Sequence, residues 1–318
     1  MIHALGGVSA VTIFAEKASG HAWPGHPERP ARIDALRSGL ERASIGLLDH
    51  AAAPTAAAAQ IERVHDAAWL DTLAALATAP RQLGHDVYVT AASMPAARRA
   101  AGGAIAAVEA VLAGRRAWSL CRPPGHHATP TAAMGFCLLS NAAIAARCAQ
   151  AEHGVAKVAI VDWDVHHGNG TQDVFYEDPS VLTISLHESQ LYPGTGAADE
   201  RGAGAGRGAC LNVPVAGRTG PERYLELFDD AVPGAIAAFA PDLVIVSCGF
   251  DAHVDDPLAT LELEAGTFAA LVTRVRDLCR ELAIPEPALV QEGGYDLPAL
   301  CDCATAVIEA YWTDTSRG

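Results

Sequence analysis

Residues 157–172 read KVAIVDWDVHHGNGTQ, and this stretch decides the fold that we expect. Its first part, 158–161, is an unbroken apolar and β-branched run, which is typical of a strand buried on both faces of a parallel sheet. If the strand continues, Asp162, Asp164 and His166 alternate with apolar residues and share one face. In an open α/β sheet, ligands bind beyond the carboxyl ends of the strands, where carboxylate and imidazole groups can hold one divalent ion.

The density of polar residues after this strand favours a functional site over ordinary loop chemistry. A single Asp or His at a strand end is usually a helix cap or a solvated loop residue. Here residues 162–170 contain two Asp, two His and a Gly-Asn-Gly turn, which caps and turns explain poorly. We therefore interpret this segment as part of a metal or catalytic site.

Outside this stretch, apolar strand candidates alternate with amphipathic helix candidates. That alternation predicts an α/β fold with a doubly wound, mostly parallel sheet flanked by helices. Because we find no composition break and no internal repeat, residues 1–318 are expected to form a single domain. Residues 20–30 and 84–89 are expected to be loops, and Pro233 to kink or divide its helix. The expected strands span 11–15, 117–121, 158–161, 181–186, 211–215, 243–247 and 288–291, and the expected helices span 31–43, 61–76, 91–112, 138–151, 222–239, 265–282 and 298–312.

The composition narrows the class of protein. The chain is 50% hydrophobic with a formal net charge of −15, which argues against nucleic-acid binding and is compatible with cationic substrates. Eight scattered cysteines without a C-x-x-C pair are typical of reduced thiols in a cytoplasmic protein. The apolar segment 91–113 contains Arg98, Arg99 and Glu109, so we expect a helix of a soluble protein there, not a membrane span. Residues 1–14 lack a basic region, and we interpret them as a lead-in to the first strand rather than a signal peptide.

Unusual polar residues follow four of the expected strands. His126 and His127 come after the strand that ends at residue 121. Asp251 follows the strand that ends at residue 247, and Tyr295 follows the last strand. Parallel strands bring their carboxyl ends to one edge of a sheet, so these groups can meet the 162–166 segment in one pocket. Three protein ligands with one open coordination position form the usual design of a catalytic metal site.

The motifs at these strand ends resemble those of the histone deacetylase superfamily. In chain order they are GHPERPARI (25–33), RPPGHHA (122–128), DWDVHHGNGTQ (162–172), ISLHE (184–188), YPGTG (192–196), GFDAHVDDPL (249–258) and EGGYDL (292–297). The series spans nearly the whole chain and is highly specific, because separated motifs would have to arise together by chance. The HPE sequence and Asn169 look more like the class II branch and its bacterial relatives, which include acetylpolyamine amidohydrolases.

The resemblance implies an arginase/deacetylase-type fold and one zinc ion held by Asp164, His166 and Asp251. Neutral imidazole and carboxylates suit zinc, although ferrous iron accepts the same ligands. A water molecule can take the open position, where zinc lowers its pKa and polarises the amide carbonyl. The resemblance thus implies a zinc-dependent deacetylase that acts on an acylated amine.

The resemblance also assigns catalytic roles. His127 accepts the proton of the attacking water and later protonates the leaving amine. His126, bonded to Asp162, supplies oriented positive charge or assists proton transfer, and Asp162 orients rather than binds the metal. Tyr295 donates its phenolic hydrogen to the developing oxyanion.

Substrate contacts follow from the same resemblance. Gly135, Phe136 and Tyr192 line a narrow channel for the aliphatic stem of an acyl-lysine, although core packing is a competing interpretation for Phe136. Asp86 accepts hydrogen bonds from substrate near the channel mouth. Leu258 occupies a position where polyamine-selective relatives can carry Glu, which favours acyl-lysine over a cationic polyamine.

Two further points come from the resemblance. A structural potassium ion below the zinc is implied, with ligands from Asp162, Asp164, His166, Ser185 and Leu186. Many family members have an acidic residue where this chain has Asn169, and without that carboxylate the proton on His127 is held less tightly.

Alternatives stay open on the sequence alone. Acetylpolyamine hydrolysis is the first, and a catalytically silent acyl-lysine-binding or scaffold protein is the second. A two-metal ureohydrolase is disfavoured because FDAHVDD (250–256) lacks the required alternation of carboxylates. His167, His187 and His253 can be structural, and Asp255 and Asp256 are interpreted as turn or cap residues. The physiological substrate, the acyl chain length and the oligomeric state are not fixed by the sequence.

Overall fold

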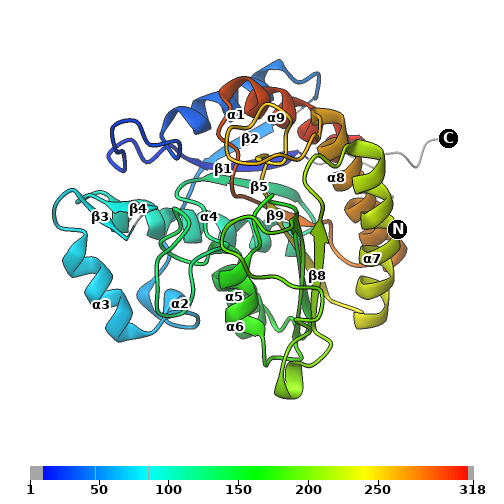
Figure 1. Cartoon of the computed structure of the whole chain (residues 1–318), viewed down its shortest axis with the longest axis horizontal. Helices are drawn as coiled ribbons and strands as arrows, with labels where there is room; N and C mark the ends of the chain where they lie inside the picture. The colour runs from blue at the N-terminus through cyan, green and yellow to red at the C-terminus, as the bar shows by residue number, and fades with distance from the viewer. Residues whose placement is uncertain (1–9, 47, 85, 314–318) are drawn as a thin grey trace, which may run out of the picture.

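Eight parallel strands form the centre of the protein, which we describe from a computed structural model of residues 10–46, 48–84 and 86–313. The strand order is β2-β1-β5-β10-β9-β6-β7-β8, and every neighbouring pair is parallel (Figure 1). The α/β fold predicted from the alternation of strands and helices is thus confirmed. The strands are β1 (Val11–Glu16), β2 (Leu48–Ala52), β5 (Arg116–Cys121), β6 (Val158–Asp162), β7 (Val181–Glu188), β8 (Cys210–Val215), β9 (Leu243–Cys248) and β10 (Ala288–Gln291).

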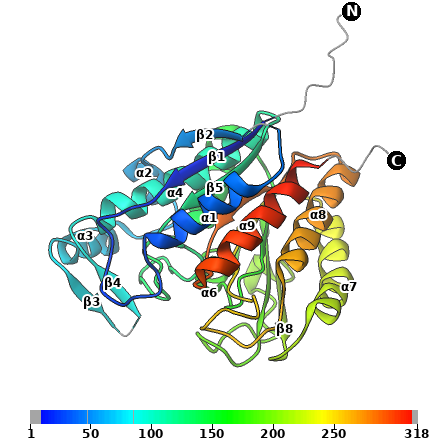
Figure 2. The same cartoon turned by 90° about the horizontal axis from the view of Figure 1, so that it is seen from above.

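Helices cover both faces of the sheet because the central strands are apolar on both faces. One face is covered by α1 (Ala31–Arg42), α9 (Leu297–Trp312), α8 (Ala265–Glu281) and α7 (Pro221–Phe239), which lie side by side in that order (Figure 2). The other face is covered by α4 (Ser93–Leu112), α5 (Asn141–His153) and α6 (Asn169–Phe175). Alternate residues of β6 enter the two resulting cores, with Val161 in one and Ile160 in the other.

Two predicted elements differ from the structure near residues 58–89. The helix expected at 61–76 is two helices, α2 (Ala58–Ile61) and α3 (Ala67–Leu76). The helix is interrupted between them because the Asp66 N–H donates to the Pro130 carbonyl and His65 accepts from the Ser140 N–H. The loop expected at 84–89 contains β4 (Val87–Val89), which pairs antiparallel with β3 (Arg81–Leu83).

Other local expectations had mixed outcomes. The strand expected at 158–161 is confirmed as β6, and it does not continue through residue 166, because the Asp162 carboxylate accepts the Asp164 N–H and turns the chain. Helix α7 continues through Pro233, since its fully buried stripe, including Val232 and Ile236, is fixed by the core on either side. Two short elements, β2 and α6, had no strong pattern in the sequence and were missed.

The sheet order explains how the site is assembled. Strands β5, β10, β9 and β6 are consecutive in the middle of the sheet, and these are the four strands followed by the polar motifs. Their carboxyl ends therefore lie side by side at one edge. In the part of the chain that the structure describes, no helix is both long enough and apolar enough to cross a bilayer.

Candidate active site

Asp164, His166 and Asp251 come together beyond the ends of β6 and β9, as the sequence predicted. His166 Nδ1 lies 3.1 Å from Asp164 Oδ1 and 3.1 Å from Asp251 Oδ2. The two carboxylates have no exposed surface, and the imidazole is 8% exposed. Backbone amides hold both acids in place: the Gly293 N–H donates to Asp164 Oδ2 at 2.8 Å, and the Val165 N–H donates to Asp251 Oδ1 at 2.9 Å.

The geometry of these three groups fits a small divalent cation. Donor atoms from all three lie within 4.8 Å of one another. A tetrahedral site with bonds of about 2.0 Å separates its donor atoms by about 3.3 Å, close to the 3.1 Å found here. The two buried carboxylates raise the pKa of His166 to about 10 against the effect of burial, so the triad holds a positive charge, which a bound metal ion can supply in place of the His166 proton. The sequence prediction of a metal site is therefore compatible with the side-chain arrangement.

Glycine is required beside these carboxylates. A Cβ atom at Gly293 would lie 2.1 Å from Asp251 Oδ2 and 2.5 Å from Asp164 Oδ2. No side chain fits such a space. The EGGYDL motif thus brings backbone against the carboxylates of Asp164 and Asp251.

His126 and His127 have opposite electrostatic environments. His126 Nδ1 lies 2.9 Å from Asp162 Oδ2. Burial alone would lower the pKa of His126, but Asp164 and Asp162 raise it well above the usual value, so this ring is cationic. The pKa of His127 is lowered well below the usual value, first by burial and then by the charges of His126 and His166. One imidazole of the pair is thus charged and the other is neutral.

The tautomer of His127 is set by Asn169. His127 Nδ1 lies 2.7 Å from Asn169 Oδ1. The carboxamide nitrogen of Asn169 faces the His127 carbonyl at 3.4 Å and Met134 Sδ at 3.3 Å, so its oxygen faces the ring. The proton of neutral His127 therefore resides on Nδ1, and the lone pair of Nε2 is free to accept a proton.

Tyr295 lines the same cavity as His127 and His166. Its N–H donates to Asp256 Oδ2 at 2.6 Å, and this carboxylate also accepts from the Leu258 N–H at 3.0 Å. Asp256 was interpreted as a turn residue, which describes its bond to Leu258 but misses its bond to Tyr295. The spacing within the sequence carried no signal for that contact, because residues 256 and 295 follow different strands.

A cavity of about 230 Å³ leads to these groups. Phe136 and Tyr295 form an edge-to-face pair with centroids 5.6 Å apart, and Tyr192 stands edge-to-face to His127 at 5.1 Å. Tyr192 is 38% exposed, so it marks the mouth. Every residue predicted to contact substrate lines this cavity. The lining consists of Asp86, His127, Gly135, Phe136, His166, Leu191, Tyr192, Leu258 and Tyr295.

The loop at the cavity mouth is fixed by Asp86. The Gly135 N–H donates to Asp86 Oδ2 at 2.9 Å. A Cβ at Gly135 would lie 2.1 Å from the His127 ring, so this position also brings backbone against that imidazole. Phe136 has a φ of 67°, in the left-handed region that a bulky residue rarely adopts. Phe136 lines the cavity in this strained conformation, which only the surrounding contacts can maintain.

The remaining sequence candidates have structural partners. His167 bonds Thr195 and Gln172, and His187 contacts the Gly196 carbonyl, which confirms the structural interpretation for both. Asp162 and Ser185 line a small cavity of about 10 Å³, while Leu186 is buried nearby on β7. A potassium site formed by Asp162, Asp164, His166, Ser185 and Leu186 stays a prediction. All eight cysteines are free thiols, as expected.

Comparisons with known proteins agree with this arrangement. The sequence profile of the family described as "Histone deacetylase domain" matches residues 26–311. A "Histone deacetylase-like amidohydrolase" from Pseudomonas aeruginosa is 42% identical over 90% of this chain and 76% of its own length. A "Probable deacetylase" from Archaeoglobus fulgidus is 35% identical over 91% of this chain and 82% of its own. The solved structure titled "Crystal Structure of HDA15 HD domain" superposes with a TM-score of 0.90 at 38% identity, covering 96% of this chain and 90% of that one.

Proposed function

The chain belongs to the histone deacetylase family, and on that premise we propose that it is a zinc-dependent amidohydrolase that removes acetyl or similar acyl groups from acyl-lysine. The observation that carries this proposal is the convergence of Asp164, His166 and Asp251 beside a cavity lined by His127 and Tyr295. Zinc in this triad would act as a Lewis acid toward the amide carbonyl and lower the pKa of the attacking water.

His127 is the proposed proton acceptor. Its pKa is far below the usual value because of burial and neighbouring positive charge, so the ring is neutral before reaction. With Nδ1–H bonded to Asn169, Nε2 takes the proton of the attacking water and later returns it to the leaving amine. A neutral imidazole at the cavity wall supports this role.

His126 and Tyr295 are proposed to stabilise the charge that develops on the carbonyl oxygen. His126 is held as a cation by Asp162 and Asp164, so it contributes a fixed positive charge. The pKa of Tyr295 is raised well above 10 by burial, which keeps the phenol protonated as a hydrogen-bond donor. Both groups are oriented before substrate binds, which is the condition under which such donors are effective.

The cavity supports an acyl-lysine substrate more than a polyamine. Phe136 and Tyr192 present ring surfaces that suit an aliphatic stem, and Leu258 adds another apolar side chain. Asp86, at the mouth, can accept a hydrogen bond from a peptide N–H or from an ammonium group. The apolar side chain of Leu258 gives a second ammonium group no partner on that side of the cavity, where a carboxylate would favour a polyamine.

The test compares two substrate classes with one preparation. Purified protein is treated with chelator, assayed, and reloaded with one equivalent of Zn²⁺, using an acetyl-lysine peptide and N-acetylputrescine. We expect activity to disappear with chelation, to return with zinc, and to be higher for the peptide. A preference for N-acetylputrescine would overturn the substrate assignment and favour the polyamine alternative. Stoichiometric zinc with no turnover of any acylated amine would instead favour the silent binding protein.

A further inference from the structure

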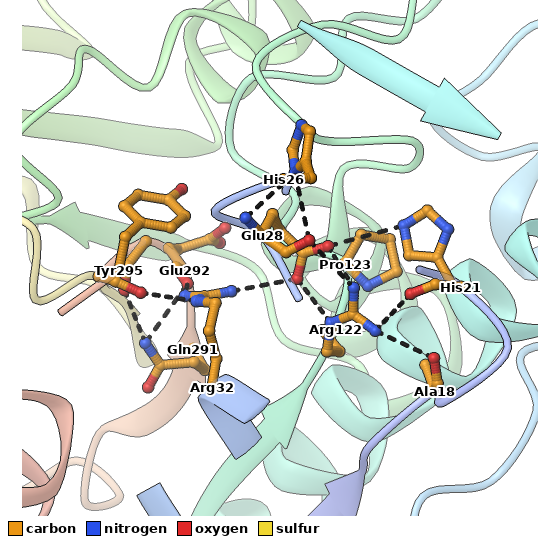
Figure 3. A network of polar contacts seen from close by, with 12 residues as sticks. Ala18, His21, His26, Glu28, Arg32, Arg122, Pro123, Gln291, Glu292 and Tyr295 are labelled. Carbon is orange, nitrogen blue, oxygen red and sulfur yellow. Dashed lines mark hydrogen bonds and ion pairs between the residues drawn. The ribbon is translucent and has the colours of Figure 1, made fainter. Parts of the chain in front are cut away.

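A buried ion network connects the N-terminal loop around Glu28 to the segment that carries Tyr295 (Figure 3). Glu28, Arg32 and Arg122 are each at most 1% exposed. Arg122 donates through Nε and an NH2 group to the two oxygens of Glu28, at 2.6 and 2.5 Å. Such a bidentate pair fixes the planes of both side chains. None of these three residues lines the cavity, so their burial has a cause other than direct contact with substrate.

Arg122 anchors the pair to surrounding backbone. It donates to the carbonyls of Ala18 and His21 at 2.9 and 2.7 Å, and to the Tyr88 hydroxyl at 3.0 Å. The Tyr88 hydroxyl in turn contacts the Glu28 carbonyl at 3.2 Å. Arg122, the bidentate partner of Glu28, is thereby held in place by backbone carbonyls and by Tyr88.

Arg32 links Glu28 to residues 292–294, which directly precede Tyr295. Its NH1 group donates to Glu28 Oε1 at 3.3 Å. Its Nε and NH2 groups donate to the carbonyls of Gly294 and Glu292, at 2.6 and 2.5 Å, and its guanidinium lies 4.9 Å from the centroid of the Tyr295 ring. In Figure 3, Arg32 lies between Glu28 on one side and the backbone leading to Tyr295 on the other. Segment 292–294 includes two glycines and needs such external anchors to hold one conformation.

The same loop supports Tyr295 from a second direction. His26 Nδ1 accepts from the Glu28 N–H at 3.1 Å, and the His26 ring packs edge-on against Phe136 at 4.6 Å. Phe136 packs edge-on against Tyr295 at 5.6 Å. The phenol is therefore held between the Arg32 guanidinium and the Phe136 ring, and both depend on residues 26–32.

We propose that Glu28 is a positioning residue for the reaction, acting through Arg32 and the backbone of 292–294 to hold the Tyr295 hydroxyl where the oxyanion develops. This inference rests on the proposed function of Tyr295 as a hydrogen-bond donor. Charge burial alone does not account for the network, since a buried ion pair is often no more stabilising than apolar residues of the same volume. Its contacts with the catalytic segment supply the missing reason.

The protonation states keep the Glu28 network in one charge state at neutral pH. Burial alone would raise the pKa of Glu28, but Arg122 and Arg32 lower it to about 2. The pKa of His21 is lowered to about 4, chiefly by burial, so this ring is neutral and adds no charge to the network. Glu28 is therefore ionised throughout the neutral pH range.

A double-mutant cycle tests the proposal in the zinc-loaded full chain. Glu28→Gln keeps the shape of the side chain and removes its charge, so Arg32 loses its orienting partner. Because a misplacement of about 1 Å can cost about 100-fold in rate, we expect kcat to fall about 10- to 100-fold while KM changes less than about twofold. In a Tyr295→Phe background there is no hydroxyl to misplace, and Glu28→Gln should lower kcat less than about threefold further.

Controls separate a positioning role from a structural one. Glu152→Gln makes the same chemical change in the Arg63–Glu152 pair at 2.5 Å, which lies at the end of α5 before β6, at the opposite edge of the sheet. It should leave kcat and KM unchanged. If Glu28→Gln does not fold, Arg32→Lys, which keeps the charge but cannot reach both carbonyls, should give the same pattern. Equal losses in both Tyr295 backgrounds would overturn the proposal.

A structural readout keeps the two proposals distinguishable. If the wild-type protein hydrolyses no acylated amine, the proposed function fails, and crystal structures of the wild-type and variant proteins still test the positioning. We expect the Tyr295 hydroxyl to be ordered in the wild type and displaced or split between positions in the Glu28→Gln or Arg32→Lys variant. An unmoved Tyr295 in the variant would contradict the inference whatever the activity.

Discussion

Two buried clusters of charged side chains lie near Tyr295, and burial is offset in different ways in the two clusters. Around Arg32, one carboxylate, Glu28, is matched by two guanidinium groups, and its pKa is lowered to about 2 despite burial. Around the candidate metal triad, carboxylates outnumber cations. There burial raises the pKa of Glu292 to about 7 and that of Asp162 to about 6, although His126 opposes both shifts.

The difference indicates which cluster performs chemistry and which supports it. A carboxylate that is paired with guanidinium groups, whose remaining N–H groups donate to backbone carbonyls, has a fixed geometry and no need of a ligand. A cluster with excess negative charge is stable only if protons or a cation supply the balance. The metal triad is the second kind and the Glu28 network is the first, and Tyr295 is where they meet.

The largest expected effect comes from removing one carboxylate of the unbalanced cluster. Asp251→Ala deletes one of the three proposed ligands, so we expect loss of stoichiometric zinc and a fall in activity of more than about 1,000-fold, beyond the 10- to 100-fold typical of residues that only support ligands. Metal analysis and turnover of an acetyl-lysine peptide measure both. Asp255→Ala removes a nearby exposed carboxylate and should change neither. Full activity of Asp251→Ala with zinc still bound would refute the ligand assignment.

The second largest effect is expected from a substitution of Tyr295. Tyr295→Phe removes only the hydroxyl, and loss of one oxyanion donor typically lowers kcat about 100- to 1,000-fold. Zinc content and thermal stability should stay close to those of the wild type. An unchanged kcat would show that the hydroxyl donates nothing to the transition state, and the role of the network around Arg32 would then be purely structural.

The Glu28 network should affect how the stability of the protein depends on pH in acid. The pKa of Glu28 is lowered from its ordinary value of 4.5 to about 2 in the folded protein by Arg122 and Arg32. A lowered folded-state pKa means that this stabilisation is present above pH 4.5 and is lost as the pH falls toward 2. The difference corresponds to about 3 kcal/mol. Between these pH values, the free energy of unfolding of metal-free wild type should fall about 3 kcal/mol more than that of Glu28→Gln; parallel curves would contradict the lowered pKa.

The smallest effect concerns the proton on His127. Asn169→Asp places a carboxylate beside Nδ1, which favours the protonated ring and raises its pKa, typically by about 1–3 units for an adjacent opposite charge. His127 acts as a base only when neutral, so the acidic limb of the kcat/KM profile should move to higher pH. If the acidic limb does not move, it reports the titration of a group other than His127.

The sequence predicted the site better than it predicted the boundaries of the fold. Asp164, His166, Asp251, both histidines and Tyr295 all stand at strand ends, and parallel pairing fixes where such ends meet. Local errors arose where tertiary contacts overrode the pattern, as where Pro130 and Ser140 divide the helix expected at 61–76.

Contacts between distant loops could not be predicted from spacing. Glu28 and Arg122 are separated by 94 residues, and Arg32 and Gly294 by 262. GHPERPARI carried the resemblance to the family, but nothing in its spacing placed Arg32 against the backbone that precedes Tyr295. Side-chain to backbone bonds of this kind depend on the packing of α1 beside the end of β10, which only the three-dimensional structure shows.

Anomalous diffraction from crystals of the zinc-loaded protein, with data on both sides of the zinc edge, tests the central claim most directly. The account predicts one strong peak per chain, within about 2.0–2.2 Å of Asp164, His166 and Asp251, with the Tyr295 hydroxyl facing it across the cavity. A peak elsewhere, or a triad without one while zinc is bound at other residues, would contradict it.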